Sequence, residues 1–449
     1  MAASIFRTAG DAPEPSAAYP QMSIRALFRG REAWIFLAFL VVRVAYTLAT
    51  RHMELGLERD VDRYEMLSER ILAGDHDMET WLFIVAPFYP YLQAAFKFVF
   101  GGHWQLPLLV LQLLMGAWSG VVLHRIARRM FDDRVALVSA AIYCVFLPTL
   151  AWAYSFAQDM PFQILLIFSI HAMLRAIEDR TWGRTAWAAV LFALTFLTKS
   201  HILLFAPFLA LHWWLNMKEP PARKAAHLAL YVTVCFAFTL PHGLYNLQRH
   251  GIYVLSSTGQ GGHFLTGHND DAYAYLVDPP PLGSAEHRRL LNMDYTVIRE
   301  LRDTVATLPH GEKQRVWMQA GLEWCRENPR KLMVLLAYDL YWFLLPGVNY
   351  NLYSFGNWLL MFAASAPVYL FAYPGLWIAW RRSLRKHAWM AGLFASMVIF
   401  SCVFYAQNRF RTITLEPYYI IYASFALLRF ARWAGLEKRF PALEAPVEA

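Results

Sequence analysis

The chain has 449 residues, of which 57% are hydrophobic and only 16% are charged, whereas about a quarter of the residues of a soluble globular protein are charged. This composition excludes an ordinary soluble protein, because several apolar runs reach the roughly 20 residues that a helix needs to cross a bilayer. The net charge of +8 does not indicate nucleic-acid binding, since the basic residues stand in short clusters between apolar runs. The four scattered cysteines form no metal-binding or redox motif.

The sequence predicts an all-α, multi-pass membrane protein with about ten transmembrane helices. Basic clusters fall in every second connection between the apolar runs, as expected of cytoplasmic loops, and this pattern places both termini in the cytoplasm. Residues 1–32 and 435–449 are then cytoplasmic tails. The predicted spans are 33–50, 104–123, 134–150, 161–177, 185–198, 201–217, 226–243, 357–380, 388–406 and 413–430.

The first outer loop, residues 51–103, follows the first span. Within it Tyr64, Leu67 and Ile71 recur at helical spacing, and Asp60 stands one turn before Tyr64. We therefore expect a short amphipathic helix with a carboxylate at its leading end, although Asp60 is also a good N-cap residue. The proline-rich, aromatic stretch 86–103 predicts a second helix in the membrane interface.

The later part of the chain divides into two predicted regions after a transmembrane module over residues 33–243. Residues 244–330 are long and polar and are expected to fold into a domain on the outer face. Residues 331–434 are expected to hold an interfacial helix followed by the last transmembrane helices. The apolar run 332–347 contains Asp339 and is predicted to lie in the outer leaflet, because a crossing there would reverse every later helix.

Ionisable residues near membrane depth gather at the outer ends of the predicted helices, and such residues are functional candidates because burying charge is costly. They are Asp60, Asp159, Lys199, Arg409, Arg411 and Glu416. For Asp159, capping of the fourth helix is the alternative, and for the basic residues contact with lipid headgroups is the alternative. Arg43 lies deeper than these residues and is expected to anchor packing through a carboxylate partner.

The glycine-rich stretch GGHFLTGHNDD contains His263, His268 and two aspartates, but its spacing matches no familiar zinc pattern. Glycines allow sharp turns and close backbone approach. We therefore predict a loop that closes over a bound molecule, and no metal site.

Several motifs taken in chain order resemble the GT-C superfamily of membrane glycosyltransferases, especially bacterial relatives of the protein O-mannosyltransferases and of the aminoarabinose lipid A transferase. The resemblance covers about residues 33–430. It departs from the family pattern at Ser200, where glycine is usual, and at Tyr245, where arginine is usual. The motifs are RDVDRYEMLSERILAG with Asp60 and Tyr64, PFYP at 87–90, SFAQDMPFQ at 155–163, LFALTFLTKSHILLF at 191–205, the stretch 240–273 with His268 and Asn269, and QNRFRTITLEPYYIIYASFAL at 407–427.

The resemblance implies a GT-C-like bundle in the bacterial inner membrane. It also implies an enzyme that moves a sugar from a polyprenyl-phosphate carrier to a hydroxyl of a glycan, lipid or protein acceptor on the periplasmic face, with inversion. Such a reaction needs one base for the acceptor hydroxyl and cations for the leaving phosphate. Asp60 is the predicted base and Asp62 its reserve. The predicted substrate-binding residues are Arg63, Tyr64, Asp159, Lys199, His263, Asn269, Arg409 and Arg411.

The predicted partners are the lipid-linked sugar, the acceptor and membrane lipids, with no nucleic acid. No cofactor is certain, and a divalent metal, Mg²⁺ or Mn²⁺, stays open because some relatives use one beside the second acidic site. The rival functions are a transporter or flippase of lipid-linked glycans and a polysaccharide polymerase or ligase. A transporter is disfavoured because the sequence has no internal repeat and its ionisable residues gather at one face.

Overall fold

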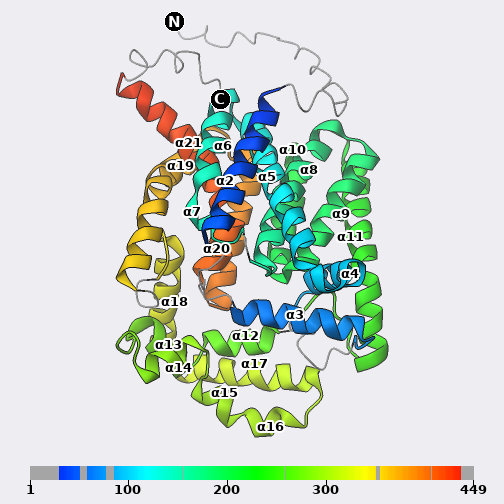
Figure 1. The fold of residues 1–449 in the computed structure, drawn as a ribbon, viewed down its shortest axis with the longest axis vertical. Coiled ribbons are helices and arrows are strands. Elements are labelled where there is room, and N and C mark those ends of the chain that lie inside the picture. The colour runs from blue at the N-terminus through cyan, green and yellow to red at the C-terminus, as the bar shows by residue number, and fades with distance from the viewer. Residues whose placement is uncertain are drawn as a thin grey trace, which may run out of the picture.

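The computed structural model describes residues 30–50, 58–76, 85–153, 155–257, 259–349, 354–405 and 407–435. The predicted tails therefore lie almost entirely outside the described residues. Over these ranges the chain is built from helices, and no strand is formed. Figure 1 shows a bundle of long helices with a layer of shorter helices across one end.

The bundle contains a helix at each position where the sequence predicts a span. The long helix α19 is interrupted at Ser383, whose backbone is not helical (φ −157°, ψ 82°), so that α19 comprises two of the predicted spans. The elements of the bundle are α2 (Arg31–Thr50), α5 (Gln105–Met130), α6 (Asp133–Val145), α7 (Leu147–Leu150), α8 (Asp159–Asp179), α9 (Trp182–Thr198), η3 (Ser200–Phe205), α10 (Ala206–Asn216), α11 (Pro221–His250), α19 (Phe355–Val403), α20 (Asn408–Thr414) and α21 (Glu416–Trp433).

By length and composition, five helices within the described residues are able to cross a membrane: α2, α5, α8, α11 and α19. The chain is thus a membrane protein, as its composition predicts. The helices α6, α9 and α10 are shorter than 18 residues, and the number of ten crossings stays a prediction.

Small residues allow the bundle helices to approach closely, as is usual where helices pack within a membrane. A Cβ atom added at Gly120 of α5 would lie 2.5 Å from the ring of Phe39 on α2. One added at Gly375 of α19 would lie 2.1 Å from the carbonyl oxygen of Tyr422 on α21. Larger side chains at these two glycines would force the paired helices apart.

The expectation that Arg43 has a carboxylate partner is wrong within the described residues. The side chain is buried in α2, and its guanidinium carbon lies 5.7 Å from the ring centroids of both Phe39 and Tyr143. Aromatic faces attract a cation without bringing a second charge into the bundle. Arg43 is therefore held by aromatic packing rather than by an ion pair.

The layer at one end of the bundle is formed by two stretches that are far apart in sequence. In Figure 1, α3 lies across the end of the bundle, with α12 and α17 on its other side. The elements of this layer are α3 (Glu58–Leu72), α4 (Phe88–Phe100), η2 (Gly101–His103), α12 (Gln260–Gly267), α13 (Asp270–Val277), α14 (Ala285–Leu291), α15 (Thr296–Glu300), α16 (Arg302–Ala306), α17 (His310–Glu327) and α18 (Pro329–Leu344).

The apolar run near 332–347 forms α18, which is not one of the five candidate spans. Figure 1 shows α18 beside α13 at the end of the bundle that carries the shorter helices. Asp339 is buried at 1% exposure. This placement agrees with an interfacial helix, and its position relative to a bilayer stays a prediction, as do the domain boundaries.

Candidate active site

Three charged side chains from three elements meet at the end of the bundle that faces the layer. Asp159 is the first residue of α8, Lys199 follows α9, and Arg409 lies in the first turn of α20. One carboxylate oxygen of Asp159, Oδ1, accepts a hydrogen bond from Arg409 Nε at 2.8 Å and lies 3.1 Å from Lys199 Nζ. The sequence predicted all three as substrate-binding residues, and the fold brings them together.

Helix ends explain why these residue types suit these positions. Lys199 is the C-cap residue of α9, where the partial negative charge of the helix terminus favours a cation. Asp159 stands in the first turn of α8, where the partial positive charge favours an anion. Asp159 does not act as the N-cap, because Gln158 occupies that position and the Asp159 carboxylate is bound to the two cations.

Within this triad, one carboxylate contacts two cations. Asp159 is completely buried, and its second oxygen, Oδ2, has no hydrogen-bond partner among the described residues. Lys199 is 4% exposed, and its Nζ lies 4.8 Å from the ring centroid of Phe410. The Arg409 guanidinium lies 5.5 Å from the ring centroid of Trp152. The two cations are therefore held in fixed positions by one carboxylate and by aromatic rings.

A chain of contacts links the triad to α3, the helix of the first outer loop. The ring of Tyr64 on α3 packs edge-on against Tyr89 on α4, with centroids 5.4 Å apart. Tyr89 donates a hydrogen bond to Gln112 of α5 at 3.0 Å, and Gln112 donates to the carbonyl of Ser155, four residues before Asp159. Burial raises the pKa of the Tyr89 hydroxyl and the negative charge of Asp159 raises it further, so this hydroxyl acts as a neutral donor.

The backbone of Asp60 lies in the first turn of α3. Its side chain lies outside the described part of the structure. Asp60 falls after the helix start at Glu58, so the N-cap alternative does not fit these bounds. Tyr64 is buried at 2% exposure and Arg63 is partly buried, whereas Asp62 is exposed. The face of α3 that carries Tyr64 therefore packs against the protein, whereas Asp62 lies on the exposed face.

His263 of α12 faces the same region from the layer. Its Nδ1 lies 3.2 Å from the hydroxyl of Tyr405, which follows α19. Burial, together with the positive charges of Arg63 and Lys199, lowers the pKa of His263 to about 4. The side chain of His263 is accessible to solvent, and with this lowered pKa its imidazole is neutral at pH 7.

Asn269 has a structural part in the layer. It is the N-cap of α13, where its side-chain oxygen accepts a hydrogen bond from the backbone N–H of Ala272 at 2.8 Å. Its side-chain nitrogen donates to the carbonyl of Leu265 at 2.6 Å. Both ends of this buried amide are used, so contact with a substrate requires these bonds to be exchanged.

Arg411 is separated from Arg409 by one residue but points into the bundle. It is completely buried, and its guanidinium donates to Glu416 and to the carbonyls of Trp342, Phe343, Leu345 and Gly347 at the end of α18. Because carbonyl groups at a helix end lack partners within the helix, Arg411 fastens α18 to α20. A phosphate would have to displace these bonds, which makes Arg411 a positioning residue.

Sequence reasoning missed several contacts of the triad. The rings of Trp152 and Phe410 contact the cations of Arg409 and Lys199, respectively. The hydroxyl of Tyr405 contacts Nδ1 of His263. The sequence did not predict these contacts for any of the three. Aromatic residues are common throughout the chain, so only the tertiary contact distinguishes these three.

A divalent metal would need several oxygen or nitrogen ligands in one place. The described residues contain no group of three His, Cys, Asp or Glu side chains that could hold a metal ion. The bound oxygen of Asp159 is already taken by two cations. The described residues around Asp159 therefore do not fit a metal centre.

The fold of the chain is similar to the folds of solved membrane proteins. It is similar to the oligosaccharyltransferase AglB from Archaeoglobus fulgidus, solved in complex with an inhibitory peptide and a dolichol-phosphate, with a TM-score of 0.53 and 12% identity over 94% of this chain and 53% of AglB. The apo form of the oligosaccharyltransferase from this organism gives a TM-score of 0.55 with the same identity and coverage. The chain spans about half the length of these archaeal enzymes. Its helical fold is like theirs, in agreement with the predicted GT-C-like bundle.

Part of the chain also matches a protein-family model. Residues 85–245 match the family described as dolichyl-phosphate-mannose-protein mannosyltransferase. This match covers about a third of the chain and agrees with the resemblance predicted from its motifs.

Two further comparisons gave a weak match and no match. ArnT from Cupriavidus metallidurans, solved with undecaprenyl phosphate, shares 17% identity over 91% of this chain and 80% of ArnT, but the TM-score of 0.37 is too low to establish a common fold. No sequence among the curated proteins matches the chain.

Proposed function

We propose that the protein is a membrane glycosyltransferase that moves a sugar from a polyprenyl-phosphate carrier to an acceptor hydroxyl at the periplasmic face of a bacterial inner membrane. The acceptor oxygen forms a bond to the anomeric carbon while the bond from that carbon to the phosphate oxygen breaks. The acceptor proton passes to the carboxylate of Asp60, and the carrier leaves as polyprenyl phosphate. Attack on the face opposite the leaving group inverts the anomeric carbon.

The observation that carries this proposal is the buried triad of Asp159, Lys199 and Arg409. A leaving phosphate carries negative charge that needs stabilisation by fixed cations, and such groups act most strongly where water is excluded. Lys199 and Arg409 are fixed by the same carboxylate oxygen and by aromatic rings. They are therefore preorganised to receive the phosphate, with Asp159 as the group that orients them.

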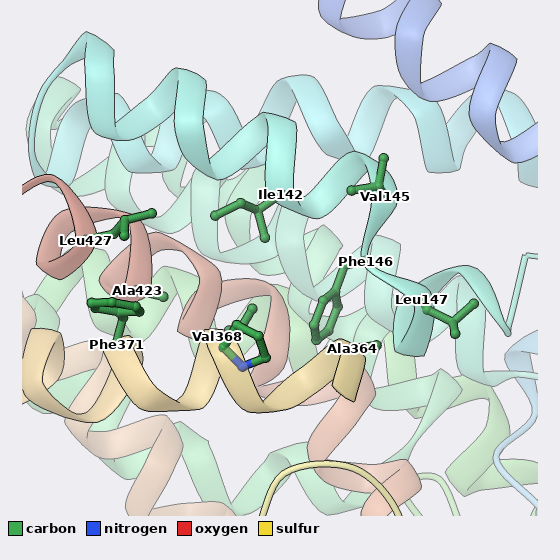
Figure 2. Close-up of a pocket in the computed structure, with 10 residues that line it drawn as sticks. Ile142, Val145, Phe146, Leu147, Ala364, Val368, Phe371, Ala423 and Leu427 are labelled. Carbon is green, nitrogen blue, oxygen red and sulfur yellow. The ribbon is translucent and has the colours of Figure 1, made fainter. Parts of the chain in front are cut away.

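An apolar hollow in the bundle suits the tail of the carrier. It has a volume of about 330 Å³. Figure 2 shows that its walls come from α6, α7, α19 and α21. Leu147 of α7 lines the hollow, and five residues later Trp152 lies beneath the Arg409 guanidinium. A phosphate at the triad and an isoprenoid chain in the hollow could thus belong to one molecule. The lining residues are Ile142, Val145, Phe146, Leu147, Ala364, Pro367, Val368, Phe371, Ala423 and Leu427.

The proposed base belongs to the first turn of α3. Asp60 precedes Tyr64 by four residues, so the two positions share one face of α3, and Tyr64 is linked through Tyr89 and Gln112 to the segment before Asp159. Arg63 and His263 flank the same region. We infer that the acceptor enters between α3 and α12. The dolichol-phosphate and peptide found with AglB support a lipid-phosphate donor and an acceptor that meet in a fold of this kind.

The test is a transfer assay with the full chain in lipid nanodiscs and a panel of polyprenyl-phosphate-linked radiolabelled sugars. We expect release of polyprenyl phosphate from at least one donor, together with transfer of the label to glycan, lipid or peptide acceptors. Lys199→Met is the matched variant, and its release should be much slower. In proteoliposomes, movement of the intact donor across the membrane without any release would instead support a transporter.

The pKa of His263 predicts a specific dependence of stability on pH. Its pKa of about 4 in the folded protein lies below its ordinary value, which is about 6.5. The unfolded chain therefore binds the proton first, and the fold loses stability as the pH falls from about 6.5 towards 4. Thermal unfolding in detergent at pH 7 and pH 4.5 should show a smaller loss of Tm for His263→Gln than for the wild type.

Tyr405→Phe is the control for this measurement. It removes the hydroxyl next to His263 but keeps the imidazole, so its dependence on pH should follow the wild type. An equal loss of Tm in His263→Gln and in the wild type would contradict the assignment.

A further inference from the structure

A second hollow lies at the opposite end of the molecule from the candidate active site. It has a volume of about 90 Å³ and forms where the end of α5 meets the break in α19 at Ser383 and the C-terminal half of α21. Figure 1 shows α21 running to the end of the bundle that is farthest from α12 and α17. The lining residues are Met130, Phe131, Ala379, Arg382, Ser383, Lys386, His387 and Phe425.

Aromatic side chains form one wall of this hollow. Phe131 stacks on Phe425 with ring centroids 4.4 Å apart, and His387 stacks on Phe131 at 5.4 Å. The Nδ1 atom of His387 lies 2.9 Å from the hydroxyl of Tyr422, and His387 is 4% exposed. The hollow is therefore bounded by packed aromatic rings.

Basic side chains surround the hollow. The guanidinium carbons of Arg382 and Arg429 lie 5.9 Å and 5.8 Å from the centroid of the same ring, Phe425. Among the described residues neither arginine forms an ion pair with a carboxylate, and neither does Lys386. Glu178 acts electrostatically on Lys386 but is bound to Arg129 Nε at 2.6 Å.

Like charges held this close repel one another, and an anion between them would relieve the repulsion. The surroundings favour a lipid as the source of that anion. Leu384, Phe430 and Trp433 are 58%, 48% and 83% exposed on the neighbouring turns, where acyl chains could cover them. Basic pockets between transmembrane helices at the membrane surface are suited to anionic headgroups.

We propose that this hollow binds the headgroup phosphate of an anionic phospholipid. Arg382 and Lys386 contact the phosphate oxygens, Arg429 adds charge from α21, and the hydroxyl of Ser383 faces the same space. The lipid would hold the break of α19 against α21. This site is separate from the proposed transfer reaction, so neither depends on the other.

The experiment compares two double variants that remove the same charge from one turn. Arg382→Gln/Lys386→Gln changes the hollow, while Arg381→Gln/Arg385→Gln is the control, because the Arg381 guanidinium lies over Trp377 and neither residue lines the hollow. The full chain in a neutral detergent is titrated with phosphatidylglycerol, with phosphatidylcholine, and with inorganic phosphate. Thermal unfolding gives the shift in Tm, and native mass spectrometry counts the bound lipids.

Phosphatidylglycerol should raise the Tm of the wild type and of the control equally. For Arg382→Gln/Lys386→Gln its apparent affinity should fall by about tenfold or more, with one fewer lipid retained, because each basic residue contributes measurably to headgroup binding. An equal response of both double variants would overturn the proposal. So would an equal shift with phosphatidylcholine, or the full effect with inorganic phosphate alone, which would mark a site for soluble anions.

Discussion

Replacing Asp60 with asparagine is expected to lower the rate of sugar transfer by about 10²- to 10⁴-fold, the usual contribution of a general base. Asparagine keeps the shape of the side chain but cannot accept the acceptor proton as the new bond forms. The loss should appear in kcat, since the donor phosphate is bound by other groups. Steady-state release of polyprenyl phosphate from the purified variant measures it.

Asp62→Asn is the matched control for this prediction. The two aspartates are two residues apart, so they point about 200° apart around the helix, and Asp62 is exposed. Its variant should keep most of the activity. Full activity in Asp60→Asn would remove Asp60 as the base, and a selective loss in Asp62→Asn would move that role to the reserve candidate.

Much of the fold follows from local patterns in the sequence. The apolar runs give helices at the predicted positions, and the spacing of Tyr64, Leu67 and Ile71 gives α3, whose inward face carries these residues. Pro87 precedes α4 as expected of a helix start. These features depend on periodicity and backbone preferences within a few residues, which a single sequence records directly.

The candidate site was only partly predictable, because it depends on contacts between distant segments. Lys199 and Arg409 were both expected to bind phosphate, but their shared attachment to one oxygen of Asp159 joins residues about 250 positions apart. Arg409 and Arg411 look equivalent in the sequence. A difference of about 200° around α20 turns one towards the triad and the other towards the end of α18. No local pattern separates these roles.

The partner of Arg43 was also not predictable from the sequence. A buried arginine in a membrane helix suggests a carboxylate partner, yet α2 and α6 supply the rings of Phe39 and Tyr143 instead. Nothing in the spacing along α2 indicates an aromatic partner on another helix. Which residues contact a buried charge thus depends on how the helices pack together in the bundle.

Asp159→Asn should be the most destabilising single change in the site. It would leave two cations at a buried position without their carboxylate, and breaking a buried ion pair in this way costs about 3–5 kcal/mol. Unfolding of the variant in detergent measures the loss. Glu65→Gln is the control, because Glu65 lies 3.7 Å from Lys97 in a partly exposed pair, and such pairs contribute about 1 kcal/mol or less.

The double variant Asp159→Asn/Lys199→Met separates the stability of the triad from its proposed use. Removing one cation together with the carboxylate leaves Arg409 as the only charge of the three, and Arg409 is 25% exposed and can reach solvent. The double variant should therefore recover much of the stability lost in Asp159→Asn. Transfer should stay weak, since the cation that complements the leaving phosphate is gone. If Asp159→Asn alone unfolds like the wild type, the carboxylate does not hold the two cations, and the preorganised phosphate site proposed at this end of the bundle fails with it.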